Sequence, residues 1–171
     1  MQVLRFLNTN CVRLELETTA TVPIEDETEA GMARRERHDK EAVIGELAHL
    51  LDASGQVVNV SKLTRDLINR ERKATTAILP GVAFPHVRTL QVRSFIIGFA
   101  RAQGEGLPFA STDGTPTKLF FPLVSPPYDD RIYLQVYRQL AYLVANEELI
   151  EQLLVASSVQ AVYNIMRQVL S

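Results

Sequence analysis

The chain has 171 residues, a single cysteine and a formal net charge of −2 at pH 7, with a pI near 5.9. This charge argues against a protein that holds nucleic acid by phosphate contacts. One cysteine excludes an intramolecular disulfide and a cysteine-based metal cluster, and a chain of this length can bury roughly 70% of its unfolded surface without either. The start, MQVLRFLNTNCVRLELE, is interrupted by charges and has no continuous apolar core, which argues against a signal peptide, and no run of 18 apolar residues could span a membrane. We therefore expect a cytoplasmic protein.

The first third of the chain predicts a strand, a charged surface segment and a helix. Residues 11–17, CVRLELE, alternate apolar and polar side chains, which predicts a half-buried strand. Residues at about 20–40 are dense in both charge signs and poor in large apolar groups, which indicates either a surface loop or an exposed helix start. Residues 40–55 show helical spacing of leucine and valine, with Gly55 as the expected stop.

The middle third predicts another helix and two buried strands. Ser61 is the expected N-cap of a helix within residues 58–73. Residues 94–101 and 117–125 are short and strongly apolar, which is typical of adjacent central strands buried on both faces. Pro122 predicts a strand end or a bulge in the second of these, and an Asp-Gly pair between the two strands predicts a turn.

The last third is predicted to be helical. The segment DDRIYLQVYRQLAYLVA has Asp129 or Asp130 as its cap, EELIEQLLVA follows it, and SVQAVYNIMRQVL is capped by Ser157 or Ser158. Helices thus interleave with apolar strands along the chain. We predict an α/β fold of one domain, residues 1–171, with helices on both faces of a mixed sheet.

One of the three histidines occupies an unusual position. His38 lies in the charged segment and His49 on a helix, where solvent exposure or partial burial explains them. His86 ends the run TTAILPGVAFPH, in which Gly81 permits unusual backbone angles and Pro85 restricts the chain before the histidine. An imidazole with an ordinary pKa near 6.5 is largely neutral at pH 7 and suits the acceptance and release of a phosphoryl group. From spacing alone, a structural histidine fits equally well.

Groups that could stabilise a phosphoryl group lie close to His86 in the sequence. Phosphoryl transfer needs in-line positioning and donors for the phosphoryl oxygens, and Arg70 and Arg88 could supply them. Thr75 and Thr76 could also bind phosphate, or could act only as β-branched strand formers. The histidines have no carboxylate or cysteine partners at metal-binding spacing, so we predict no metal or other cofactor.

The block NRERKATTAILPGVAFPHVR resembles the signature of the type 2 IIA domains of the bacterial phosphoenolpyruvate:sugar phosphotransferase system, the mannitol/fructose group that includes nitrogen-regulatory IIA proteins. The matching residues are Arg70-Glu71, Thr75-Thr76 and Gly81 to His86, at the family spacing. The later FASTDGTPTKLFFPLVSP and YLQVYRQLAYLV are also similar, so the resemblance covers about residues 40–170. It implies an α/β sandwich around a mixed, mostly five-stranded sheet.

The resemblance also implies a function. In this family the histidine of the Pro-His pair accepts phosphate from the histidine-containing phosphocarrier protein, and then passes it to a IIB domain or serves as a regulatory signal. By resemblance this residue is His86, with Arg70 beside the phosphoryl site and with Thr76, Arg88 and Tyr133 as candidates for the phosphate pocket. We expect His86 to be partly exposed at the rim of a shallow depression, within side-chain reach of Arg70 and Tyr133.

Two residues and one segment depart from the family pattern. The charged residues at about 20–40 look like an insertion between the first strand and the first helix. Tyr133 stands where many members have a second histidine, and a phenol donates one hydrogen bond but supplies no imidazolium charge. Pro80 stands where a small or polar residue is usual. Two hypotheses therefore stay open: a phosphocarrier-type regulatory IIA protein that is transiently phosphorylated on His86, or a IIA-fold regulatory module that binds a partner and has lost phosphoryl transfer.

Overall fold

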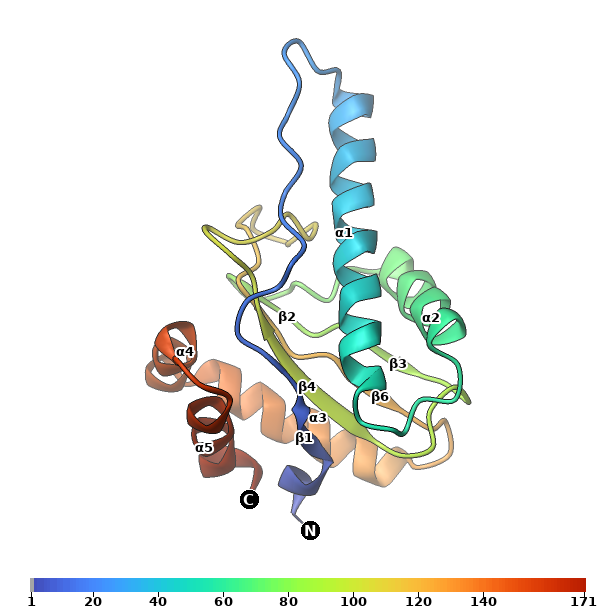
Figure 1. Ribbon diagram of the computed structural model, residues 1–171, viewed down its shortest axis with the longest axis vertical. Coiled ribbons are helices and arrows are strands. Elements are labelled where there is room, and N and C mark those ends of the chain that lie inside the picture. Colours follow the sequence, from blue (N-terminus) through green and yellow to red (C-terminus); the bar gives the residue numbers. More distant parts are fainter. Residues whose placement is uncertain (1) are drawn as a thin grey trace.

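The computed structural model describes residues 2–171, which form a mixed β-sheet with helices on both faces (Figure 1). The helices are α1 (Glu29–Asp52), α2 (Val60–Lys73), α3 (Asp130–Ala145), α4 (Glu147–Val155) and α5 (Val159–Leu170), preceded by the 3-10 helix η1 (Val3–Phe6). The strands are β1 (Leu7–Arg13), β2 (Val82–Ala83), β3 (His86–Arg88), β4 (Ile96–Arg101), β5 (Leu119–Phe120) and β6 (Leu123–Ser125). Among residues 2–171, no helix is long and apolar enough to cross a membrane.

The sheet is organised around β4. This strand pairs with β1 in parallel and with both β5 and β6 in antiparallel orientation. Next to β5 and β6 lie the outer strands of the sheet: β2 pairs with β5 and β3 pairs with β6, both in parallel. The prediction of two adjacent central strands is confirmed, and Pro122 marks the break between β5 and β6.

Each face of the sheet has its own apolar core. Helices α1 and α2 pack on one face, and α3, α4 and α5 pack on the other. Because side chains alternate along a strand, β4 serves both cores: Ile97 and Phe99 belong to the α3 side, and Ile96 and Ala100 to the α1 side. The predicted α/β fold with helices on both faces is confirmed.

Two local predictions are wrong. The first strand runs from Leu7 to Arg13 and not over residues 11–17. Beyond the strand, Leu16 is buried in the core and its amide still donates to the Arg101 carbonyl of β4 at 2.8 Å, which accounts for the strand-like alternation although no regular strand continues there. The N-cap of α2 is Asn59 and not Ser61, because the Asn59 side chain accepts a hydrogen bond from the Lys62 amide at 2.9 Å.

The loop after Leu16 and the first half of α1, up to Lys40, form an arm that rises from the body of the protein (Figure 1). The expected exposed helix start is confirmed, because α1 begins at Glu29 behind a Thr28 cap. The buried apolar residues of α1 all lie within residues 43–51, so its first half has no apolar face to bury and extends beyond the sheet.

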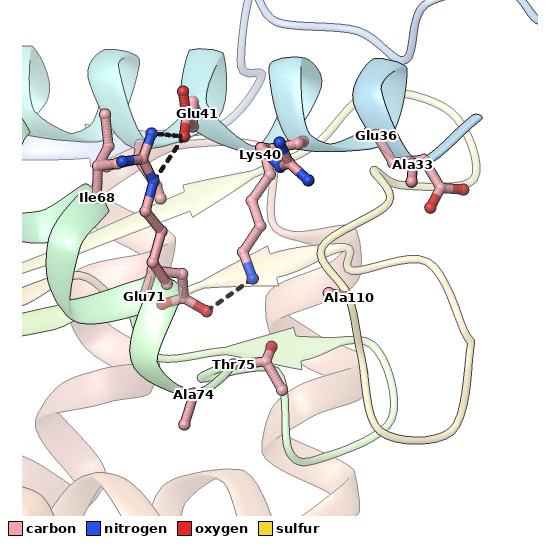
Figure 2. Close-up of a pocket in the computed structure, with 12 residues that line it drawn as sticks. Ala33, Glu36, Lys40, Glu41, Ile68, Glu71, Ala74, Thr75 and Ala110 are labelled. Atoms are coloured by element: carbon pink, nitrogen blue, oxygen red, sulfur yellow. Dashed lines mark hydrogen bonds and ion pairs between the residues drawn. The ribbon is translucent and has the colours of Figure 1, made fainter. Parts of the chain in front are cut away.

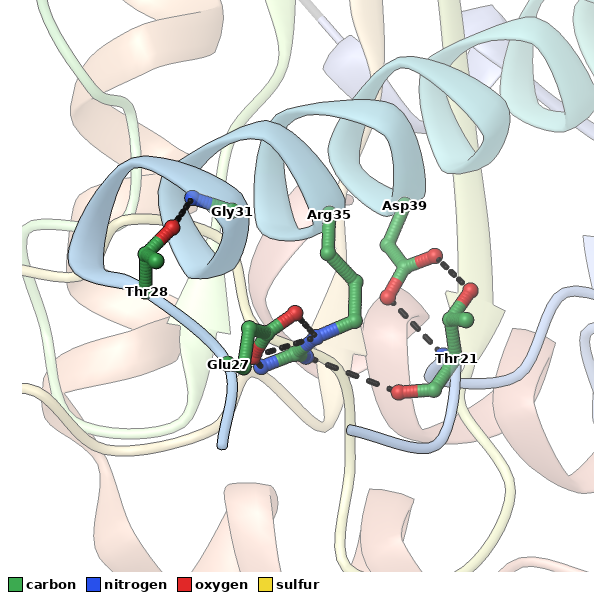
Figure 3. Close-up of polar contacts among 6 residues, drawn as sticks. All are labelled: Thr21, Glu27, Thr28, Gly31, Arg35 and Asp39. Carbon is green, nitrogen blue, oxygen red and sulfur yellow. Dashed lines mark hydrogen bonds and ion pairs between the residues drawn. The ribbon is translucent and has the colours of Figure 1, made fainter. Parts of the chain in front are cut away.

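Carboxylates of α1 hold the incoming loop of the arm. The Asp39 side chain accepts hydrogen bonds from the amide and the hydroxyl of Thr21, at 2.9 Å and 2.5 Å, and Glu27 pairs with Arg35 (Figure 3). Glu46 accepts hydrogen bonds from Thr18 and other loop groups. Burial alone would raise the pKa of Glu46, but these hydrogen bonds outweigh it and the pKa lies below its ordinary value. The charged carboxylates therefore fix the loop against the helix.

Candidate functional site

The hydrophobic run before His86 breaks at a tight turn. The amide of Val82 donates to the carbonyl of Leu79 at 3.2 Å, and Gly81 between them has φ +72°. Pro80 followed by a glycine with positive φ is the residue pair that a type II turn requires. The turn sends the chain into β2, so Pro80 has a structural role at this position.

Two neighbouring strands are interrupted at the same level of the sheet. Phe84-Pro85 separates β2 from β3, and Phe121-Pro122 separates β5 from β6. Backbone hydrogen bonds span the interruption, from Phe121 N–H to the Ala83 carbonyl and from Leu123 N–H to the Pro85 carbonyl, both at 2.9 Å. His86 is the first residue after the break, in register with Leu123, and β3 is an edge strand whose pairing with β6 fixes the backbone of the histidine.

The imidazole of His86 has two distinct nitrogens. Nδ1 lies 2.7 Å from the carbonyl oxygen of Phe84. A carbonyl only accepts, so Nδ1 carries the proton of the neutral ring and Nε2 keeps a lone pair. Arg70 Nη2 lies 3.3 Å from Nε2, while Arg70 Nη1 donates to the carbonyl of Ala74 at 3.1 Å.

Burial keeps this imidazole neutral. It lowers the pKa of His86 below its ordinary value; the Phe84 carbonyl opposes this effect, and the Arg70 charge reinforces it. The side chain is more buried than we expected, since His86 is 8% exposed. The expected proximity of Arg70 is confirmed, and the result is an uncharged nucleophilic nitrogen beside a fixed cation.

The remaining predicted pocket residues lie at different distances from this nitrogen. Thr76 is buried and donates from its amide and its hydroxyl to Glu71, at 2.7 Å and 2.8 Å. Arg88 donates to the Pro127 carbonyl at 2.6 Å and pairs with Asp130 at the start of α3. Neither Thr76 nor Arg88 is directed to His86 by these bonds.

Two tyrosines of α3 lie beside the imidazole. The ring of Tyr133 is 6.5 Å from that of His86, and Arg88 lies over its face at 5.3 Å. Tyr137 is closer, in an edge-on arrangement with ring centroids 5.4 Å apart. Tyr137 is not among the pocket residues predicted from the sequence, although its position four residues after Tyr133 places both on one face of the helix.

Two hollows flank the site without containing His86. The larger, about 420 Å³, lies between the arm and the end of α2, where Lys40 pairs with Glu71 at 3.1 Å (Figure 2). The smaller, about 270 Å³, is apolar, and its lining includes Phe84, Tyr137 and the exposed Ile78 and Leu79. Glu71, which lines the larger hollow, directly follows Arg70 in the chain. Tyr137, which lines the smaller hollow, is in ring contact with His86.

Comparison with known proteins identifies the family. Residues 31–169 match the family described as phosphoenolpyruvate-dependent sugar phosphotransferase system, EIIA 2. The chain belongs to this family. The predicted membership is confirmed, and the family includes sugar-specific and nitrogen-regulatory IIA proteins.

Individual IIA proteins support the same assignment. The fructose-specific EIIA component of Haloferax volcanii is 32% identical over 130 residues, which cover 76% of this chain and 84% of that protein. The chain spans only 21% of the length of the fructose-specific EIIABC component of Bacillus subtilis, with 32% identity over 133 residues.

Solved IIA structures share the fold. The nitrogen regulatory protein IIA-Ntr of Neisseria meningitidis has a TM-score of 0.78 at 23% identity, with 96% of this chain and 98% of that chain covered. The mannitol IIA of Escherichia coli, in its complex with phosphorylated IIB, has a TM-score of 0.69 at 19% identity, with 94% and 96% covered. At these identities the likeness concerns the fold alone.

Proposed function

We propose that this IIA domain is a phosphocarrier whose His86 is transiently phosphorylated on Nε2. The observation that carries the proposal is the arrangement of one side chain: Nδ1–H is held by the Phe84 carbonyl, and the Nε2 lone pair lies 3.3 Å from the Arg70 guanidinium. A neutral imidazole with a fixed tautomer is a nucleophile, and a cation at its free nitrogen stabilises the charge on incoming phosphoryl oxygens.

The proposed transfer requires only a donor that carries a phosphohistidine, as the family's histidine-containing phosphocarrier protein does. The phosphorus–nitrogen bond of the donor breaks and its electron pair stays on the donor's nitrogen. The lone pair of His86 Nε2 forms the new bond to phosphorus, while the Nδ1 proton stays in its hydrogen bond to Phe84. The reverse of these events passes the group to an acceptor, so the domain acts as a carrier.

The acceptor is a IIB domain or a regulatory target protein. The mannitol IIA of E. coli forms a complex with phosphorylated IIB, and the similar N. meningitidis protein is a nitrogen regulatory protein. Both roles use the same chemistry at the histidine, so the structure of His86 and Arg70 supports phosphoryl transfer in either one.

Phosphorylation is tested by intact mass. The protein is incubated with phosphoenolpyruvate, the first enzyme of the system and the cognate phosphocarrier protein, and we expect one acid-labile phosphoryl group. His86→Ala should abolish the labelling, and His38→Ala and His49→Ala should leave it unchanged. Arg70→Ala should slow it by roughly 100- to 1000-fold, as is typical when one preorganised donor to a developing oxyanion is removed.

The same experiment decides between the two hypotheses. An unchanged mass with the cognate donor, under conditions that phosphorylate a control IIA domain fully, would refute the carrier function. The protein would then be a IIA-fold module that regulates a partner by binding alone.

A further inference from the structure

The hydroxyl groups of Tyr133 and Tyr137 lack an assigned role. The two rings lie 5.7 Å apart on α3, and both side chains are half-buried. Among residues 2–171, neither hydroxyl has a hydrogen-bond partner within the protein. Packing explains the rings, since Tyr137 also contacts Phe84 with centroids 6.4 Å apart, but a phenylalanine would pack as well. Neither hydroxyl is among the buried polar atoms without a partner, so both are open to solvent and available to a ligand.

The Arg70 guanidinium beside His86 Nε2 influences the pKa of both tyrosine hydroxyls. Burial raises the pKa of Tyr137 and of Tyr133, and the Arg70 charge partly offsets the rise for each. The same guanidinium is 3.3 Å from His86 Nε2, and the rings of Tyr137 and Tyr133 lie 5.4 Å and 6.5 Å from the His86 ring. Because burial disfavours the phenolate, both groups are hydrogen-bond donors at neutral pH.

We propose that Tyr137, assisted by Tyr133, donates a hydrogen bond from its hydroxyl to the phosphoryl group on His86 and so binds that group directly. This inference rests on the proposed function. A phosphoryl group on Nε2 presents three acceptor oxygens, and Arg70 is the charged donor beside it. The tyrosine hydroxyls supply neutral donors from the α3 side, where other family members place a second imidazole.

Arg88 packs against Tyr133, one of the two tyrosines. Its guanidinium lies over the Tyr133 ring at 5.3 Å and is itself held by Pro127 and Asp130. Tyr137 has the closer ring contact with His86, 5.4 Å against 6.5 Å for Tyr133. Of the two hydroxyls, we therefore expect that of Tyr137 to contribute more.

The test compares Tyr137→Phe, Tyr133→Phe and the double variant with Tyr142→Phe. The phenylalanines keep the rings and remove only the hydroxyls, and Tyr142 is a matched control because it lies on the same helix and is 67% exposed. The first readout is the equilibrium constant for phosphoryl transfer from the cognate phosphocarrier protein. Tyr137→Phe should shift it toward the donor by roughly 2- to 10-fold, the range expected for one hydrogen bond.

The second readout is the phosphorus-31 resonance of the phosphorylated protein and its titration with pH. Loss of a donor should raise the pKa of the phosphoryl group in Tyr137→Phe and leave it unchanged in Tyr142→Phe, a difference that altered packing alone would not produce. If the wild-type protein accepts no phosphoryl group, the proposed function and this inference both fall. If it is phosphorylated and Tyr137→Phe matches Tyr142→Phe in both readouts, only this inference is overturned.

Discussion

The properties of His86 depend on a small number of neighbouring groups. Burial is the main reason that its pKa lies below the ordinary value, and the Arg70 charge adds to the effect while the Phe84 carbonyl opposes it. A neutral ring accepts a phosphoryl group and an imidazolium does not, because the nitrogen must offer a lone pair. The lowered pKa therefore keeps the His86 ring neutral at pH values somewhat below the usual 6.5 of a free histidine, as the proposed carrier function requires.

Removing the Arg70 charge should raise the pKa of His86, and with it the pH below which the ring becomes protonated. As pH falls through the pKa of His86 in the folded protein, the neutral form of its ring is lost. In Arg70→Gln the pKa should rise, so the acceptor form is lost at a higher pH than in the wild type, yet it should stay below 6.5 because burial remains. An NMR titration of the His86 ring protons measures it, with His49 as the internal reference. An unchanged or lower His86 pKa in Arg70→Gln would contradict the arrangement.

At the scale of elements, local patterns predicted the helices and long-range pairing determined the strands. Apolar spacing and capping residues, such as Asp129 before α3, lie within one helix and can be recognised in the sequence. The division of one strand into β2 and β3 depends on β5 and β6, which are distant in the chain. The family motif indicated Arg70 beside His86, but the position of Tyr137 required the packing of α3 against the sheet.

The centre of β4 has no room for a side chain at Gly98. A Cβ there would lie 3.0 Å from the Cys11 carbonyl oxygen, 3.0 Å from Pro122 Cγ and 3.1 Å from Leu51 Cδ2. Gly98→Ala should therefore lower the free energy of unfolding by roughly 1–3 kcal/mol, the usual cost of overpacking. Urea denaturation measures the change.

Gly45→Ala is the matched control for this prediction. Gly45 lies inside α1, and a Cβ there would meet only Thr64 Cγ2, at the ordinary distance of 4.0 Å. The substitution should stabilise the protein by about 0.5–1 kcal/mol, because alanine loses less backbone freedom than glycine in a helix. If Gly98→Ala were as stable as Gly45→Ala, the close approach of β1, α1 and Pro122 to β4 would be wrong.

At the scale of the whole molecule, one sheet separates two cores that carry different natural probes. Of the five tyrosines, Tyr133, Tyr137 and Tyr163 pack against the core on the side of α3, α4 and α5, and the chain has no tryptophan. The other two, Tyr128 and Tyr142, are exposed. The single cysteine, Cys11, is buried in the core on the side of α1 and α2. Burial raises the pKa of its thiol to about 11, so the thiol is protected in the folded protein.

These probes test whether residues 1–171 unfold as one domain. We expect the urea transition seen by tyrosine fluorescence and that seen by pulsed alkylation of Cys11 to have the same midpoint, because β4 contributes side chains to both cores and neither core can open alone. Gly98→Ala should move both midpoints together, and Cys11→Ser gives the alkylation blank. Alkylation of Cys11 at urea concentrations that leave the tyrosine signal native would show that the layer of α1 and α2 opens separately, and the single-domain prediction would fail.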